Sequence, residues 1–257
     1  MIASPEASNR DRECKLYEPH PFFKAIIDSY RASGRPAYRE VGPVEGRAML
    51  RAAALAATSS IDAVSLASIE NRSIDGPHGA IPLRLYRPIE SARGVIVYFH
   101  SGGWVIGDLD TADATCRRLS ALTKCCLISV EYRLAPEHSF PQPLDDAYAA
   151  LLWASKLSLG PMVVAGESSG GNLAAACAIR ARQGAGPRLV GQWLAYPVTD
   201  HDFSTGSYRQ VGDRNWLLST ADMRWFWDQY CPAGVDRDNP EISPLRLADL
   251  RGLPPAM

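Results

Sequence analysis

The chain has 257 residues, of which 46% are hydrophobic and 21% charged, so it can bury a full core, and no stretch indicates extended disorder. Its formal net charge of -1 excludes the strongly basic surface that nucleic acid requires and favours a small molecule as partner. The N-terminus lacks the apolar run of a signal peptide, and no apolar run is long enough to span a membrane, so we expect a cytoplasmic protein without membrane contact.

In the N-terminal segment 1–59, helical patterns dominate from Tyr17 to about Ser59, where two helices precede any strand. The following segment alternates between apolar and polar residues and predicts two antiparallel strands, joined by a turn from Gly76 to Gly79. That hairpin begins the segment 60–199, in which short apolar runs alternate with helical patterns. Buried strands separated by helices predict an α/β fold with a mostly parallel sheet and helices on both faces.

After the run LVGQWLAY the pattern changes. Residues 200–231 end in an aromatic helix and contain no evident strand, which indicates an insertion packing over the carboxyl edge of the sheet. Residues 232–257 are expected to return to the core. Six cysteines show neither a CxxC pair nor zinc spacing, so we expect reduced structural thiols and no metal ion.

A GxSxG pattern, Gly166 to Gly170, lies between an apolar strand and a helix rich in small residues. This context is typical of a nucleophile elbow, in which a serine occupies a strained and exposed turn between strand and helix. A tight structural turn is the alternative. The flanking elements favour Ser168 as the nucleophile of acyl transfer.

A second glycine-rich loop follows the strand VIVYF, and it contains His100, Ser101, Gly102 and Gly103. Attack of a serine on an ester carbonyl creates a negatively charged oxygen, which backbone amides can stabilise. The alternative is an ordinary glycine turn. Because the loop follows a buried strand upstream of the elbow, we favour an oxyanion role for it.

Four segments together resemble the hormone-sensitive lipase family of bacterial esterases, known as family IV of the α/β-hydrolase superfamily: FHSGGWVIGDLDTAD, VEYRLAPEHSFPQPLDDA, AGESSGGNLAAA and ISPLRLADLRGLPPA. The resemblance implies an eight-stranded sheet, of which this chain holds about six strands, under a helical cap built from residues 1–59 and 200–231. It implies hydrolysis of short-chain carboxylic esters without cofactor. It also implies that the amides of Gly102, Gly103 and Ser169 form the oxyanion hole, with His100 and Glu131 as loop support.

The sequence departs from the family pattern at two sites, because Ser101 stands where glycine is usual and Ser169 where alanine is common. Neither change removes a backbone donor, although the Cβ of Ser101 restricts a loop that relies on free torsions.

The family's catalytic acid and histidine follow the GLPPA segment, where this sequence ends, so we expect neither of them in this chain. Of the five histidines, His201 beside Asp200 is the one that could serve as a replacement base, and we rate Asp200 and His201 as weak candidates. A serine without its base is nearly inert, so the chain alone is expected to be inactive.

The end of the sequence also leaves the strand LVGQWLAY without an outer neighbour, and a bare apolar edge invites pairing. We therefore expect a second polypeptide carrying the remaining strands, or a homo-oligomer. Two further interpretations stay open. The chain is a non-catalytic small-ligand-binding protein of this fold, as plant gibberellin receptors are, or an inactive truncated product.

Overall fold

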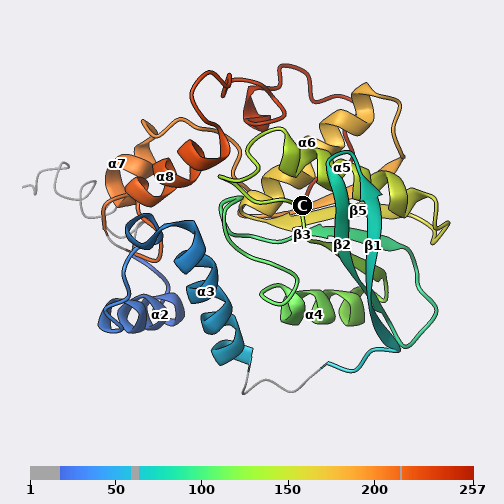
Figure 1. Ribbon diagram of the computed structural model, residues 1–257, viewed down its shortest axis with the longest axis horizontal. Helices are drawn as coiled ribbons and strands as arrows, with labels where there is room; N and C mark the ends of the chain where they lie inside the picture. The colour runs from blue at the N-terminus through green and yellow to red at the C-terminus, as the bar shows by residue number, and fades with distance from the viewer. Residues whose placement is uncertain (1–17, 59–63, 215) are drawn as a thin grey trace, which may run out of the picture. The chain divides into compact units, whose positions relative to one another are not determined.

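The computed structural model describes residues 18–58, 64–214 and 216–257. In this part of the chain six strands form one sheet in the order β1-β2-β4-β3-β5-β6 (Figure 1). The strands are β1 (Ser68–Gly76), β2 (Gly79–Arg87), β3 (Val95–Phe99), β4 (Cys126–Val130), β5 (Met162–Glu167) and β6 (Leu189–Ala195). The expected mostly parallel α/β sheet is confirmed, since the pairs β4–β3, β3–β5 and β5–β6 are all parallel.

The predicted hairpin is β1 and β2, which pair antiparallel with Gly76 opposite Gly79. β2 then pairs antiparallel with β4, so the hairpin forms one side of an otherwise parallel sheet. Every residue of β3 and β4 is buried, as central parallel strands require.

Helices cover both faces of this sheet (Figure 1). Figure 1 shows α4 (Asp113–Thr123) on one face, and α5 (Gln142–Ser155) and α6 (Ser169–Gln183) on the other. Ile96 and Tyr98 of β3 pack with Cys116 of α4 in one buried cluster. α6 is buried along nearly its whole length because most of its residues are small, chiefly alanine and glycine, which lets the helix lie close to the strands.

The remaining helices are α2 (Pro21–Ala32), α3 (Tyr38–Thr58), α7 (Gly206–Val211) and α8 (Thr220–Tyr230). α3 is kinked at Gly42, whose φ is 79°, just before Pro43. No helix among the described residues is long and apolar enough to cross a membrane.

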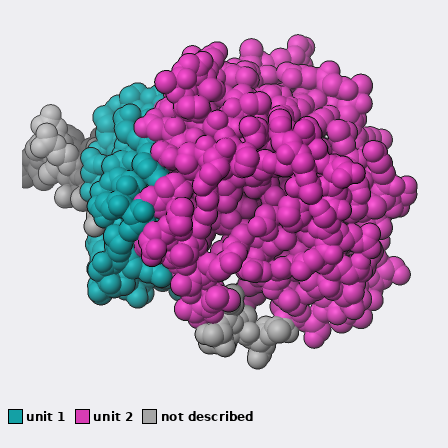
Figure 2. Space-filling model, in the orientation of Figure 1, with its two compact units in different colours: residues 1–41, 202–225 teal, residues 42–201, 226–257 magenta. Residues whose placement is uncertain are grey.

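The chain divides into two compact units, coloured separately in Figure 2. The first unit contains the described residues up to Val41 together with Asp202–Trp225, and the second contains Gly42–His201 and Phe226–Met257. The part of α3 after the kink belongs to the second unit, where Arg47 donates to the carbonyl oxygens of Val105 and Ala135.

The outer edge of β6 differs from the expectation of a bare strand. The amides of Gln192 and Leu194 donate to the carbonyl oxygens of Pro255 and Met257, and Met257 N donates back to Gln192 O, at 2.8 to 3.0 Å. Gln192 and Ala256 form a parallel bridge. Residues 255–257 therefore cover part of this edge, because the loop after 246 carries them back to it.

Candidate active site

Ser168 lies between β5 and α6, in the turn that the GxSxG pattern predicted. Its φ of 53° and ψ of -117° are rare for a residue with a side chain, and such strain concentrates at functional sites. The backbone holds the turn on both sides, since Ser168 N donates to Ala195 O at 2.9 Å and Ser168 O accepts from Val198 N at 3.1 Å. The side chain is partly exposed and caps no amide of α6.

Gly170 brings the elbow against the second glycine loop. A Cβ atom at this position would overlap the carbonyl oxygens of Phe99 and His100. The first turn of α6 therefore lies directly on the end of β3, where the loop begins. This contact places the nucleophile turn and residues 100–107 side by side.

Within that loop, Gly102 and Gly103 have φ values of 126° and 59°. A Cβ atom at Gly102 would collide with Ile106 O, and one at Gly103 would collide with the ring of Phe226. Both positions therefore require glycine, for backbone freedom and for space.

The amides of Gly102, Gly103 and Ser169 donate to no acceptor within the described residues. Ser169 is buried, whereas Gly102 and Gly103 are partly buried. Unpaired backbone donors of this kind are the groups that a bound anion would need.

His100 is fully buried at the start of the loop, and burial lowers its pKa to about 4. The ring is therefore neutral, and its Nδ1–H donates to Ser101 O at 2.7 Å. Its ring stacks on that of Tyr132, with centroids 4.3 Å apart. The imidazole is thus held between a backbone carbonyl and an aromatic ring.

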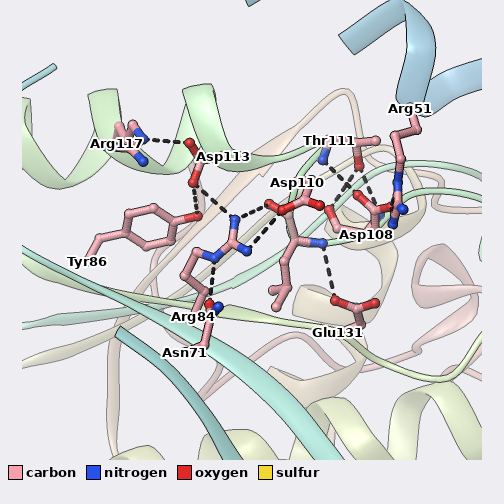
Figure 3. A network of polar contacts seen from close by, with 11 residues as sticks. Arg51, Asn71, Arg84, Tyr86, Asp108, Asp110, Thr111, Asp113, Arg117 and Glu131 are labelled. Carbon is pink, nitrogen blue, oxygen red and sulfur yellow. Dashed lines mark hydrogen bonds and ion pairs between the residues drawn. The ribbon is translucent and has the colours of Figure 1, made fainter. Parts of the chain in front are cut away.

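Glu131 contacts the segment that follows the loop, accepting from the amide of Leu109 at 3.4 Å (Figure 3). Burial raises the pKa of this carboxyl group. Arg51 of α3 donates to Asp108 at 2.9 Å, and Arg84 of β2 donates to Asp110. Side chains from α3, from β2 and from the end of β4 thus bind this segment. A cavity of about 660 Å³ lies beside it, with Glu131, Asp108 and Arg51 among its lining residues.

The start of α4 is anchored by a neighbouring group of contacts centred on Asp113 (Figure 3). Tyr86 donates to Asp113 at 2.9 Å, and Arg117 and Arg84 also bond to this carboxylate. These side chains join the sheet to the helix and do not contact the glycine loop.

Asp200 and His201 lie in a separate polar cluster. His201 Nδ1 is 3.2 Å from Ser243 Oγ and 3.4 Å from Asp200, and its Nε2 is 3.6 Å from Asp238. Asp200 also accepts from Arg246 at 2.9 Å. The structure thus brings the two candidates together, with both ring nitrogens directed at groups other than Ser168.

Three further histidines have structural partners. His78 pairs with Asp145 at 2.9 Å, His138 with Gln142 at 2.8 Å, and His20 accepts from the amide of Phe22 at the start of α2. None of these contacts involves the nucleophile turn.

The aromatic side chains near the loop are packed rather than open. Trp104 and Trp227 are fully buried, and Trp104 stacks on Tyr230 with centroids 4.3 Å apart.

The five described cysteines carry free thiols, while Cys14 lies outside the described residues. No group of three potential metal ligands occurs within the part of the chain that the structure describes.

Two side chains that the sequence did not single out also shape the site. Asn172 on α6 donates to the carbonyl oxygens of Val198 and Ile242 at 2.8 Å, which ties two loops to the first turn of the helix. Tyr132 donates to His100 O at 2.8 Å. The sequence did offer a signal for each. Asn172 is a polar residue at the start of an alanine-rich apolar helix, and Tyr132 is an aromatic residue just after a strand.

A strained serine on a strand-to-helix turn, next to a glycine loop with free amides, defines a nucleophile-elbow protein of the α/β-hydrolase class. A family model described as alpha/beta hydrolase fold matches residues 96–257. The chain belongs to this family, within its hormone-sensitive-lipase-like esterase branch.

Among curated relatives, a carboxylic ester hydrolase of Mycobacterium tuberculosis, LipN, is 42% identical over 202 residues, which cover 74% of this chain and 54% of the relative. Esterase LipI of the same organism is 40% identical and covers 72% and 61%. This chain thus spans between half and two thirds of these relatives.

Solved structures agree in fold. A thermostable esterase from Pseudomonas putida matches with a TM-score of 0.86 and 33% identity, covering 93% of this chain and 78% of that one. An esterase from Pyrobaculum calidifontis matches with a TM-score of 0.85 and 34% identity, covering 92% and 78%.

Proposed function

We propose that this chain carries the nucleophile and the oxyanion site of a serine carboxylesterase acting on short-chain esters. Ser168 Oγ adds to the ester carbonyl carbon, and its proton passes to a base. The amides of Gly102, Gly103 and Ser169 stabilise the oxyanion, the base gives the proton to the departing alcohol as its carbon–oxygen bond breaks, and an acyl-enzyme remains. Water then releases the acid by the same steps.

The observation that carries this proposal is the strained Ser168 turn, packed through Gly170 against the end of β3, together with the unbonded amides of Gly102, Gly103 and Ser169. An oxyanion hole requires donors that are fixed in place before the charge develops, and removing one donor typically costs about a hundredfold or more in rate. The esterase names of the relatives support the same chemistry.

The general base is not among the described contacts of Ser168. His100 is buried beneath the loop, and His78, His138 and His201 are bonded to other groups. We therefore propose that the 257-residue chain by itself does not turn over, because loss of the histidine of such a triad costs about a millionfold.

Two measurements on the full chain test this function. A fluorophosphonate probe at pH 9, where hydroxide can take the serine proton, should attach slowly and once per chain at Ser168, as read by mass spectrometry. Ser168→Ala should abolish the attachment. Hydrolysis of p-nitrophenyl acetate by the chain should match that of Ser168→Ala.

Attachment that is absent, or spread over other serines, would remove the support for a nucleophile at Ser168. Serine-dependent hydrolysis would contradict the proposed lack of a base.

The absence of a described histidine at Ser168 also favours a second candidate, a protein that binds a small ligand at this site without turnover. That candidate predicts no phosphonate attachment at Ser168.

A further inference from the structure

The direction of each amide at the proposed oxyanion site follows from the carbonyl group that shares its peptide bond. The peptide unit is planar and trans, so its C=O and N–H point in opposite directions. A hydrogen bond that holds the carbonyl on one side therefore aims the amide toward the other side. The partners of Ser101 O, Gly102 O and Ser168 O thus set the amides of Gly102, Gly103 and Ser169.

Backbone contacts alone hold two of these three carbonyls. Gly102 O accepts from the amides of Val105 and Ile106 at 3.1 and 3.0 Å. Ser168 O accepts from Asn172 N at 3.0 Å and from Val198 N at 3.1 Å. The directions of the Gly103 and Ser169 amides are therefore fixed by the turns themselves.

Ser101 O is different, because its donor is a side chain. His100 Nδ1 lies 2.7 Å from this oxygen. A carbonyl oxygen only accepts, so Nδ1 carries the proton. The direction of the Gly102 amide therefore depends on the orientation of one imidazole ring.

Tyr132 fixes that ring. Its phenol ring is stacked on the imidazole with an interplanar angle of 14° and a centroid separation of 4.3 Å. Its hydroxyl donates to His100 O at 2.8 Å, so the same side chain holds the peptide that precedes Ser101. Tyr132 is 1% exposed, and Gly107 approaches His100 Nδ1 so closely that a Cβ there would overlap it.

We propose that Tyr132 is a positioning residue, which aims the Gly102 amide by holding His100 in the orientation that donates to Ser101 O. This inference rests on the proposed function, since it assigns a purpose to that amide. Tyr132 acts through His100, whose carbonyl oxygen and ring it contacts.

The test compares two tyrosines whose phenols each donate a hydrogen bond of similar length. Tyr132→Phe removes the donor to His100 O at 2.8 Å, and Tyr86→Phe removes the donor to Asp113 at 2.9 Å, away from the loop. Tyr132→Leu also removes the stacked ring. For each variant of the full chain, the rate of phosphonate attachment to Ser168 at pH 9 and the midpoint of thermal unfolding are measured.

We expect Tyr132→Phe to slow attachment about threefold and Tyr132→Leu about tenfold or more, as part of the roughly hundredfold effect of an oxyanion donor. Tyr86→Phe should lower the unfolding midpoint as much as Tyr132→Phe while leaving the attachment rate unchanged. If Tyr132→Leu does not fold, the two phenylalanine variants decide the question.

A second readout needs no probe reaction. Nitrogen-15 NMR of His100 should show the Nδ1–H tautomer in the unaltered chain and in Tyr132→Phe, and a mixture of tautomers in Tyr132→Leu. Equal attachment rates in the unaltered chain and both Tyr132 variants would overturn the role of Tyr132 and leave the proposed function intact. No attachment in the unaltered chain would overturn the proposed function instead.

Discussion

A buried histidine couples protonation to folding at the start of the glycine loop. The pKa of His100 falls from an ordinary value of 6.5 to about 4 because burial disfavours the charged ring. In the unfolded chain the ring takes up a proton below pH 6.5, whereas in the folded chain it does so only near pH 4. The stability contributed by this residue is therefore complete above pH 6.5 and is lost as the pH falls toward 4.

Replacing His100 with asparagine should flatten that dependence. From the difference between the two pKa values, the unaltered chain should lose roughly 3 kcal/mol through this group between pH 6.5 and 4. Urea unfolding of both proteins across this range checks the prediction. Their stability curves should run parallel above pH 7, and equal slopes below pH 6.5 would show that His100 titrates normally in the fold.

For single residues, local sequence patterns predicted the turn at Ser168 and the glycines of the loop. Both lie directly after a strand in the chain, so the pattern and the structure that it predicts are adjacent. The role that we infer for Tyr132 could not be predicted in this way. It depends on a peptide plane 30 residues earlier in the sequence, and only the folded sheet brings the ring of Tyr132 onto His100.

At the scale of elements, Gly170 of α6 packs directly against the end of β3, and this contact positions the site. An alanine there would force its Cβ into the carbonyl oxygen of Phe99. Since backbone atoms move less easily than side chains, the helix would have to shift away from the strand.

Gly170→Ala should therefore destabilise the chain by about 1–3 kcal/mol, the usual cost of overpacking. Gly206→Ala is the matched control, since a Cβ at that helical glycine meets nothing within 4 Å and should be neutral or stabilising by up to about 1 kcal/mol. Urea unfolding of the two variants distinguishes these effects. Equal stability of both would show that α6 is free to move.

Strands and helices of the core were predictable because apolar runs and helical patterns alternate along the chain. The contact between β6 and residues 255–257 was missed, and the sequence was instead interpreted as leaving a bare edge. A segment as short as residues 255–257 has no periodic pattern that would predict a strand. Its pairing with β6 can be seen only once the path of the chain back to the sheet is known.

Among the described residues of the whole molecule, that short pairing covers part of the outer edge of β6. Deletion of residues 254–257 removes the three backbone hydrogen bonds to Gln192 and Leu194 and exposes an apolar strand. We expect a lower unfolding midpoint and faster aggregation on warming, followed by light scattering. Met257→Ala keeps the backbone and removes a side chain that is 84% exposed, so it should behave like the unaltered chain.

If the deletion leaves both the midpoint and the scattering unchanged, the pairing contributes nothing to the stability of β6.

The α/β class of the molecule followed from the order of its elements. The resemblance also implied one cap built from residues 1–59 and 200–231, and the first compact unit combines residues up to 41 with Asp202–Trp225.

The first unit consists of two stretches of chain that lie far apart in the sequence. Arg39 pairs with Asp222, and Arg31 donates to Arg214 O, in each case across 183 residues. At a ribosomal speed of about 5–20 residues per second, the early stretch emerges roughly ten to forty seconds before its counterpart. Ile27 of α2 is buried in the finished protein, but during that interval it is exposed to water. Nascent α2 is therefore expected to be a binding site for chaperones at the ribosome.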